Sequence, residues 1–157
     1  GMSDRGFQFS VREADVCFIG GRTPDERRDA SLRAKQTAEA MGKSIKTFAM
    51  CTVVHGDTDA DAEAKVEYYK SGADMGAILA MLESWGVPAE KLSSVAAAQG
   101  AFMTHTVVGS PKTCAARIEE FLRYCELDGL MMIFPDYVEG LTMFGSEILP
   151  GLRAVFQ

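Results

Sequence analysis

Short apolar runs along this chain alternate with longer stretches of helical spacing, a pattern that indicates β-strands separated by helices. Three short apolar runs predict buried strands: residues 16–19, KTFAMCTVVHGDT from residue 46, and GLMMIFP from residue 129. The second run lacks clean alternation, which is typical of a strand buried on both faces. Strands separated by helices pair in parallel through right-handed crossovers, so the pattern predicts an α/β fold with about three parallel strands and flanking helices.

The first of the intervening helices has clear signals at both ends. Thr23 is predicted to be its N-cap, Pro24 stands at the first helical position, and Glu26 completes a capping box. The helix is expected to run to about Met41, with Gly42 as its C-terminal stop.

Helical spacing returns over residues 59–85, in two pieces that break near Gly72. The stretch that follows, residues 86–104, is rich in small residues and shows no clear period. We expect residues 86–104 to form an excursion or loop within a single domain over residues 1–157.

The clearest helix is predicted in PKTCAARIEEFLRYCELDG, where Ser110 caps the start and Pro111 takes the first position. Its apolar face consists of Cys114, Ile118, Phe121, Leu122 and Cys125. A last helix is predicted from about Val138, with Leu141, Phe144 and Ile148 directed inward.

The chain opens with GMSDRGFQFSVREAD, a Ser-x-x-Gly turn followed at once by an amphipathic run. This arrangement is typical of the loop between a β-strand and a helix, yet no strand precedes it. Three parallel strands are also few, because a short parallel sheet leaves unpaired edges. We therefore expect the chain to be part of a larger doubly wound sheet or (β/α)8 barrel.

Composition narrows the function classes. The 157 residues suit one domain, and 16 Lys and Arg against 22 Asp and Glu give a net charge of −6. No basic patch marks a nucleic-acid binder, and no apolar run is long enough to span a bilayer. The four scattered cysteines each sit in an apolar stretch, which favours buried thiols in a reducing cytoplasm over disulfides or zinc.

Three segments resemble one known family. GMSDRGFQFSVREADVCFIGG, VVGSPKTCAARIEEF and DGLMMIFPDYVEGLTMFGSEILPGLR are similar to the C-terminal half of the bacterial luciferase-like, flavin-dependent monooxygenases. Within that family, the pyrimidine oxygenase and alkanesulfonate monooxygenase type is the nearest in likeness. The resemblance implies the C-terminal half of a (β/α)8 TIM-like barrel, so that the barrel's first five strands are expected to be absent from this polypeptide.

The resemblance also implies a cofactor and its site. Family members use reduced FMN and dioxygen to oxygenate a small organic substrate. The serine that matches Ser3 contacts the FMN phosphate, and Asp4, Arg5 and Gly6 are plausible helpers through main-chain N–H groups and the Arg5 charge. Because Ser also caps helices very often, Ser3 can equally be a simple N-cap. The residues that hold the flavin ring and act on the substrate belong to the other half, so the catalytic residues stay unassigned.

Other candidate chemistry is sparse. His55 follows a strand and stands near Asp57 and Asp59, a set that can be drawn as a metal site. His-x-Asp-x-Asp in a turn more often serves turn and cap chemistry, which we expect here. His105 has no carboxylate or cysteine neighbour in sequence and is predicted to be structural, with a place at the rim of the site as the alternative.

Two hypotheses about function remain open at this point. In the first, the chain is part of an FMN-dependent monooxygenase and is inactive alone; whether it binds FMN alone stays open. In the second, it is a non-catalytic half-barrel that acts as an oligomerising or ligand-binding module. Both predict a homo-oligomer, specifically a dimer, because strand edges and half-barrel interiors are adhesive. The first also implies a flavin reductase as partner.

Overall fold

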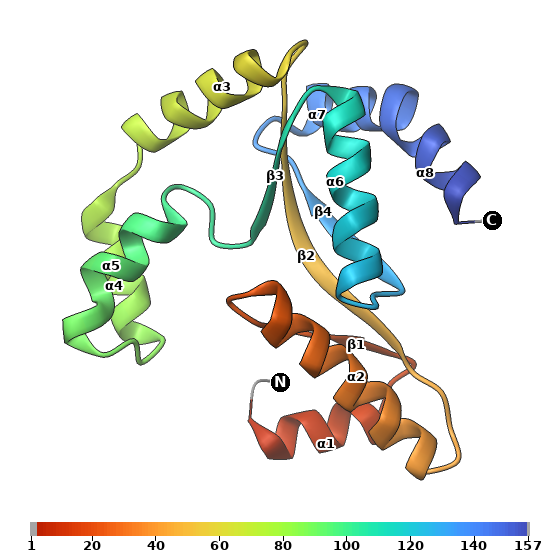
Figure 1. Ribbon diagram of the computed structural model, residues 1–157. Helices are drawn as coiled ribbons and strands as arrows, with labels where there is room; N and C mark the ends of the chain where they lie inside the picture. Colours follow the sequence, from red (N-terminus) through yellow and green to blue (C-terminus); the bar gives the residue numbers. More distant parts are fainter. Residues whose placement is uncertain (1–2, 157) are drawn as a thin grey trace.

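A parallel sheet with helices around it forms the framework of the protein (Figure 1). The computed structural model describes residues 3–156, except for the side chains at positions 98 and 99. The strands within this range are β1 (Val16–Phe18), β2 (Lys46–His55), β3 (His105–Gly109) and β4 (Gly129–Ile133). The α/β class with parallel strands is therefore confirmed, with four strands in the described range instead of about three.

β2 is the central strand and pairs along both edges. Phe48 lies opposite Phe18 of β1 on one edge and opposite Gly129 of β4 on the other. β3 shares the edge used by β1 but begins farther along, where His105 pairs with Cys51. A gap therefore separates the end of β1 from the start of β3 along the same edge of β2.

Helices occupy the segments between and after the strands. They are α1 (Asp4–Glu13), α2 (Pro24–Ala40), α3 (Asp59–Ser71), α4 (Met75–Ser84), α5 (Ala89–Gln99), α6 (Pro111–Tyr124), α7 (Tyr137–Met143), the π-helical turn η1 (Phe144–Ile148) and α8 (Leu149–Val155). Among the described residues, no helix has the length and apolar character that a membrane crossing requires.

One face of the sheet carries most of the core. Cys51 and Val53 of β2 belong to the largest buried cluster, which includes Ile118 of α6 and Leu152 of α8. A second cluster joins Cys17 of β1 to residues of α1 and α2. All four cysteines are free and buried, so the prediction of buried thiols is confirmed.

The predicted start of α2 is correct except in one hydrogen bond. The Thr23 hydroxyl accepts from the backbone N–H of Glu26 at 3.2 Å, as an N-cap should. The Glu26 carboxylate does not return to Thr23, however, and accepts from the backbone N–H of Arg22 at 2.6 Å instead. The reciprocal half of the predicted capping box is therefore wrong.

We predicted an excursion or a loop over residues 86–104, and the loop alternative is wrong for the central part. Residues 89–99 form α5, which packs against α4, and the two helices lie to one side of the sheet (Figure 1). Among the described side chains of α5, only Ala96 is fully buried, which explains why the sequence shows no apolar stripe that would predict this helix. β3 follows after residues 100–104 and was not predicted from the sequence.

The last helical segment has the predicted inward residues Phe144 and Ile148, but the prediction is wrong for Leu141. Ile148 is buried as expected, but Leu141 is 57% exposed, and Gly140 and Met143 are the buried residues of α7. Gly140 lies so close to the ring of Phe134 that a β-carbon there would stand 2.6 Å from it. This close approach fixes the rotation of α7 and directs Leu141 outward.

Candidate functional site

The first turn of α1 holds the four residues proposed to bind a cofactor. Ser3 is extended and is the N-cap, its hydroxyl accepting from the backbone N–H of Gly6 at 3.1 Å. Its carbonyl accepts from the N–H of Phe7 at 2.8 Å and begins the helix. Ser3, Asp4 and Arg5 are exposed, and Gly6 is half-buried.

This turn can accept an anion. The backbone N–H groups of Asp4 and Arg5 have no acceptor among residues 3–156, and they stand at the positive end of the helix dipole. The Asp4 carboxylate would oppose an anion, but it is drawn to the Arg33 guanidinium of α2 at 3.0 Å. Arg33 also lies 4.3 Å above the ring of Phe7, which holds it beside the turn.

Arg33 is a residue that reasoning from sequence did not find. It lies 29 positions beyond Asp4 in a helix whose charges alternate, and no local pattern joins the two segments. The contact arises because α1 and α2 pack together against β1.

The sheet presents an uncovered apolar area that we call the open face. It consists of Val16, Phe18, Met50 and Met131, which the strand register places on one side of the sheet. Their exposed fractions are 38%, 53%, 46% and 43%. In a (β/α)8 barrel, helices cover the outer face of the sheet and the inner face lines the barrel. The open face matches such an inner face. The prediction that β4 is a buried strand is wrong for Met131, which belongs to this face.

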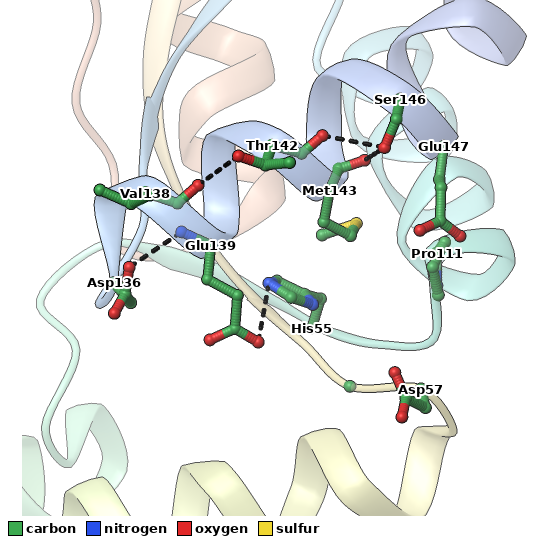
Figure 2. Close-up of a pocket in the computed structure, with 11 residues that line it drawn as sticks. His55, Asp57, Pro111, Asp136, Val138, Glu139, Thr142, Met143, Ser146 and Glu147 are labelled. Atoms are coloured by element: carbon green, nitrogen blue, oxygen red, sulfur yellow. Dashed lines mark hydrogen bonds and ion pairs between the residues drawn. The ribbon is translucent and has the colours of Figure 1, made fainter.

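A separate hollow of about 620 Å³ lies beyond the carboxyl ends of β2 and β3. Figure 2 shows the imidazole of His55 beside the carboxylate of Glu139, with Glu147 and Pro111 on the other side of the imidazole. His55 Nε2 stands 3.8 Å from Glu139 Oε1, too far for a hydrogen bond. Lys65 is closer to the same carboxylate, at 2.8 Å.

The charges in this hollow favour a structural role. Burial lowers the pKa of His55, and the neighbouring Lys65 lowers it further, so the imidazole is neutral near pH 7. The hydrogen bond and charge of Lys65 lower the pKa of Glu139, which remains ionised. The ion pair between Lys65 and Glu139 joins α3 to α7, and the neutral His55 lies beside it.

Two of the acidic residues after His55, Asp59 and Asp61, accept hydrogen bonds at helix starts. Asp61 and Thr58 form a reciprocal capping box at the start of α3. Asp59 accepts from the Ser110 backbone N–H at 2.7 Å and from the Thr113 hydroxyl at 3.0 Å, at the start of α6. Among the described side chains, no group of three potential ligands is arranged to hold a metal ion.

His105 lies at the start of β3 and stacks on Phe121 of α6, with ring centroids 3.8 Å apart. Burial, followed by the nearby charge of Arg27, lowers its pKa to about 4. The neutral ring therefore forms part of an aromatic wall, as a structural residue does. It also lines a cleft, so the alternative of a rim position stays open.

Comparisons with known proteins agree with this architecture. The model of the luciferase-like monooxygenase family matches residues 1–125. The pyrimidine monooxygenase RutA of Acinetobacter baylyi is 30% identical over 160 residues, a match that covers 96% of this chain and 43% of RutA. The chain thus spans less than half the length of the curated relatives it matches.

Two solved structures share the fold over essentially the whole chain. DmoA from Hyphomicrobium sulfonivorans superposes with a TM-score of 0.81 at 25% identity, covering 100% of this chain and 41% of DmoA. The riboflavin lyase RcaE, solved with modified FMN and riboflavin, superposes with a TM-score of 0.74 at 22% identity, covering 98% and 42%.

Proposed function

The chain belongs to the luciferase-like monooxygenase family, and from this premise we propose that it supplies the phosphate-binding turn of an FMN site in a flavin-dependent monooxygenase. The observation that carries the proposal is the capped first turn of α1. There the Ser3 hydroxyl stands beside the N–H groups of Asp4 and Arg5, which have no acceptor among the described residues. When bound, reduced flavin supplies the reaction with dioxygen, while the protein binds, orients and excludes water. The modified FMN in the riboflavin lyase structure supports this choice of cofactor.

The Ser3 hydroxyl can cap the helix and bind a phosphate at the same time. Its oxygen accepts from the N–H of Gly6 at 3.1 Å, and its own proton remains free to be donated. The free N–H groups of Asp4 and Arg5 would add two more donors, and the helix dipole favours the negative charge. Simple capping and phosphate binding are therefore compatible uses of one residue.

Charge around the turn is arranged to tolerate a phosphate. Arg33 forms an ion pair with the Asp4 carboxylate at 3.0 Å, which reduces the repulsion between that carboxylate and a bound anion. The exposed Arg5 side chain forms no ion pair with any described residue and can turn toward the phosphate. Gly6 adds no side chain where the phosphate would approach.

The open face favours a second, non-catalytic candidate function. Four exposed apolar side chains on one side of the sheet suit association with another polypeptide surface. A half-barrel that only associates would keep this surface without binding flavin. We therefore propose a homodimer through the open face under either function, with a flavin reductase as a further partner under the first.

The relatives suggest a substrate class without fixing it. RutA carries the name of a pyrimidine monooxygenase, so a small pyrimidine-like ring is the substrate we propose first. No residue of this chain is assigned to act on that ring.

A substitution at Ser3 separates phosphate binding from capping. Ser3→Asp keeps a good N-cap but adds a negative charge where the phosphate would lie. We expect titration with FMN, followed by flavin fluorescence, to show an affinity at least about 10-fold weaker than wild type, because a hydrogen bond to a charged group is worth about 1.5–3 kcal/mol. The thermal midpoint should stay unchanged.

Thr23→Asp is the matched control, since Thr23 caps α2 in the same way through the N–H of Glu26. It should leave FMN affinity within about twofold of wild type, a difference of at most about 0.4 kcal/mol. Equal FMN affinity in wild type and Ser3→Asp would refute the phosphate-binding turn and favour the non-catalytic function.

A further inference from the structure

Arg27 is a buried cation that forms no ion pair with any residue that the structure describes. It lies in the first turn of α2, and its exposed fraction is only 9%. Among residues 3–156, no carboxylate lies within ion-pair distance of its guanidinium, and no oxygen accepts a hydrogen bond from it. A guanidinium stays charged in proteins, and a buried charge is costly unless it is paired.

The surrounding residues hold the guanidinium in place. Its carbon lies 5.7 Å from the centre of the Phe121 ring, which stacks with His105 at 3.8 Å. Its aliphatic stem packs against Gly21, where a β-carbon would stand 2.8 Å from Arg27 Cγ. Gly21 has a φ of 151°, so both its backbone and its lack of a side chain leave room for the stem.

Arg27 lines a cleft at the gap between β1 and β3. Two adjoining hollows of about 500 Å³ each share Arg27, Gly21, His105 and Met103 in their walls. The gap lies beyond the carboxyl end of β1, the side where parallel α/β folds bind ligands.

The lining of the cleft is positive on one side and apolar on the other. Three cations line it, Arg22, Arg27 and Lys70, although the whole chain carries a net charge of −6. The one acidic residue in the lining, Glu26, already accepts from the Arg22 backbone at 2.6 Å. The apolar part of the wall includes Leu82, Trp85, Val87, Val95 and Met103, together with Met50 of the open face.

We propose that this cleft binds a small organic carboxylate, whose charged group pairs with Arg27 while its apolar body lies against the α4–α5 side of the cleft. His105, with a neutral ring, offers one N–H to the same carboxylate. None of residues 3–6 lines the cleft, so this inference does not depend on the FMN site.

Benzoate is a suitable probe, and benzamide is its uncharged counterpart of the same shape. In calorimetric titrations of the chain, benzoate should bind at least tenfold more tightly than benzamide. Arg27→Met, which keeps the length of the side chain without its charge, should abolish that preference. Arg28→Met removes the neighbouring, exposed cation and should leave benzoate affinity within twofold.

The thermal midpoint provides a second readout. If Arg27 is a buried charge that pairs only with a bound anion, Arg27→Met should raise the midpoint in buffer without anions. Benzoate should raise the midpoint of wild type only. Equal affinity for benzoate and benzamide in wild type would overturn the proposal, and so would equal losses in Arg27→Met and Arg28→Met. Weakened FMN binding in Arg27→Met without any benzoate binding would also overturn it, because the anion would then be the flavin phosphate.

Discussion

His105 shows how burial of one side chain sets a property of the whole fold. Its ring stacks on Phe121, and burial together with the nearby charge of Arg27 lowers its pKa from the ordinary 6.5 to about 4. In the unfolded chain the imidazole takes up a proton near pH 6.5, whereas the folded chain resists protonation down to about pH 4. Between these values the unfolded state binds more protons, so acid favours unfolding.

The free energy of unfolding should therefore decrease as the pH falls from 6.5 to 4, by no more than about 1.4 kcal/mol per pH unit from this residue. His105→Phe keeps a ring that can stack on Phe121 and removes the titration. Urea unfolding at several pH values should give a shallower decrease for His105→Phe than for wild type. Identical slopes would show that His105 is not held neutral in the folded state.

Single residues that act on their neighbours in sequence were predictable, and those that act across the fold were not. The caps Ser3, Thr23 and Ser110 were identified because an N-cap bonds a backbone group only three residues away. Arg27 and Arg33 were not singled out, because burial and distant contacts give each its role.

At the scale of elements, α7 is positioned by a glycine. Gly140 is buried against Phe134, and an added β-carbon would lie 2.6 Å from three atoms of that side chain, including its own β-carbon. Phe134 is 2% exposed within the largest core cluster and has no room to withdraw.

Gly140→Ala should therefore destabilise the fold by about 1–3 kcal/mol, the usual cost of overpacking. Gly151→Ala, at an exposed helical position with no atom within 4 Å of the new β-carbon, should be neutral or stabilising by up to about 1 kcal/mol. Chemical denaturation of both variants checks the prediction. A Gly140→Ala protein as stable as Gly151→Ala would show that α7 can move away from Phe134.

Elements with strong periodicity or paired end signals were predicted within a few residues, as α2 and α6 illustrate. α5 was missed because Ala96 is the one buried residue among its described side chains. β3 was missed as well, although none of its five residues is exposed. The inward face of α7 was also not predicted. The contact of Gly140 with Phe134, and not the apolar residues of α7, sets the rotation of this helix.

At the scale of the whole molecule, the open face is the feature that most needs a partner. Phe18 of β1, Met50 of β2 and Met131 of β4 form an apolar area beside the edges of a short sheet. The sequence had already indicated a fold larger than three strands, but the residues that form the uncovered surface became clear only from the strand register.

If two copies associate through this face, the chain should sediment as a dimer at micromolar concentration. Met131→Lys places a charge in the contact and should shift the protein to monomer without unfolding it, because Met131 is 43% exposed. Tyr68→Lys, at a site 75% exposed on α3, should remain a dimer. A wild-type chain that stays monomeric at high micromolar concentration would exclude this association.

The central claim, that the first turn of α1 holds a flavin phosphate, can be tested atom by atom. In a nuclear magnetic resonance titration of nitrogen-15-labelled chain with FMN, the account predicts the largest amide shifts at Asp4, Arg5 and Gly6. Inorganic phosphate should produce smaller shifts of the same amides in the same direction. FMN binding that leaves these three amides unmoved, or no binding at millimolar flavin, would contradict it.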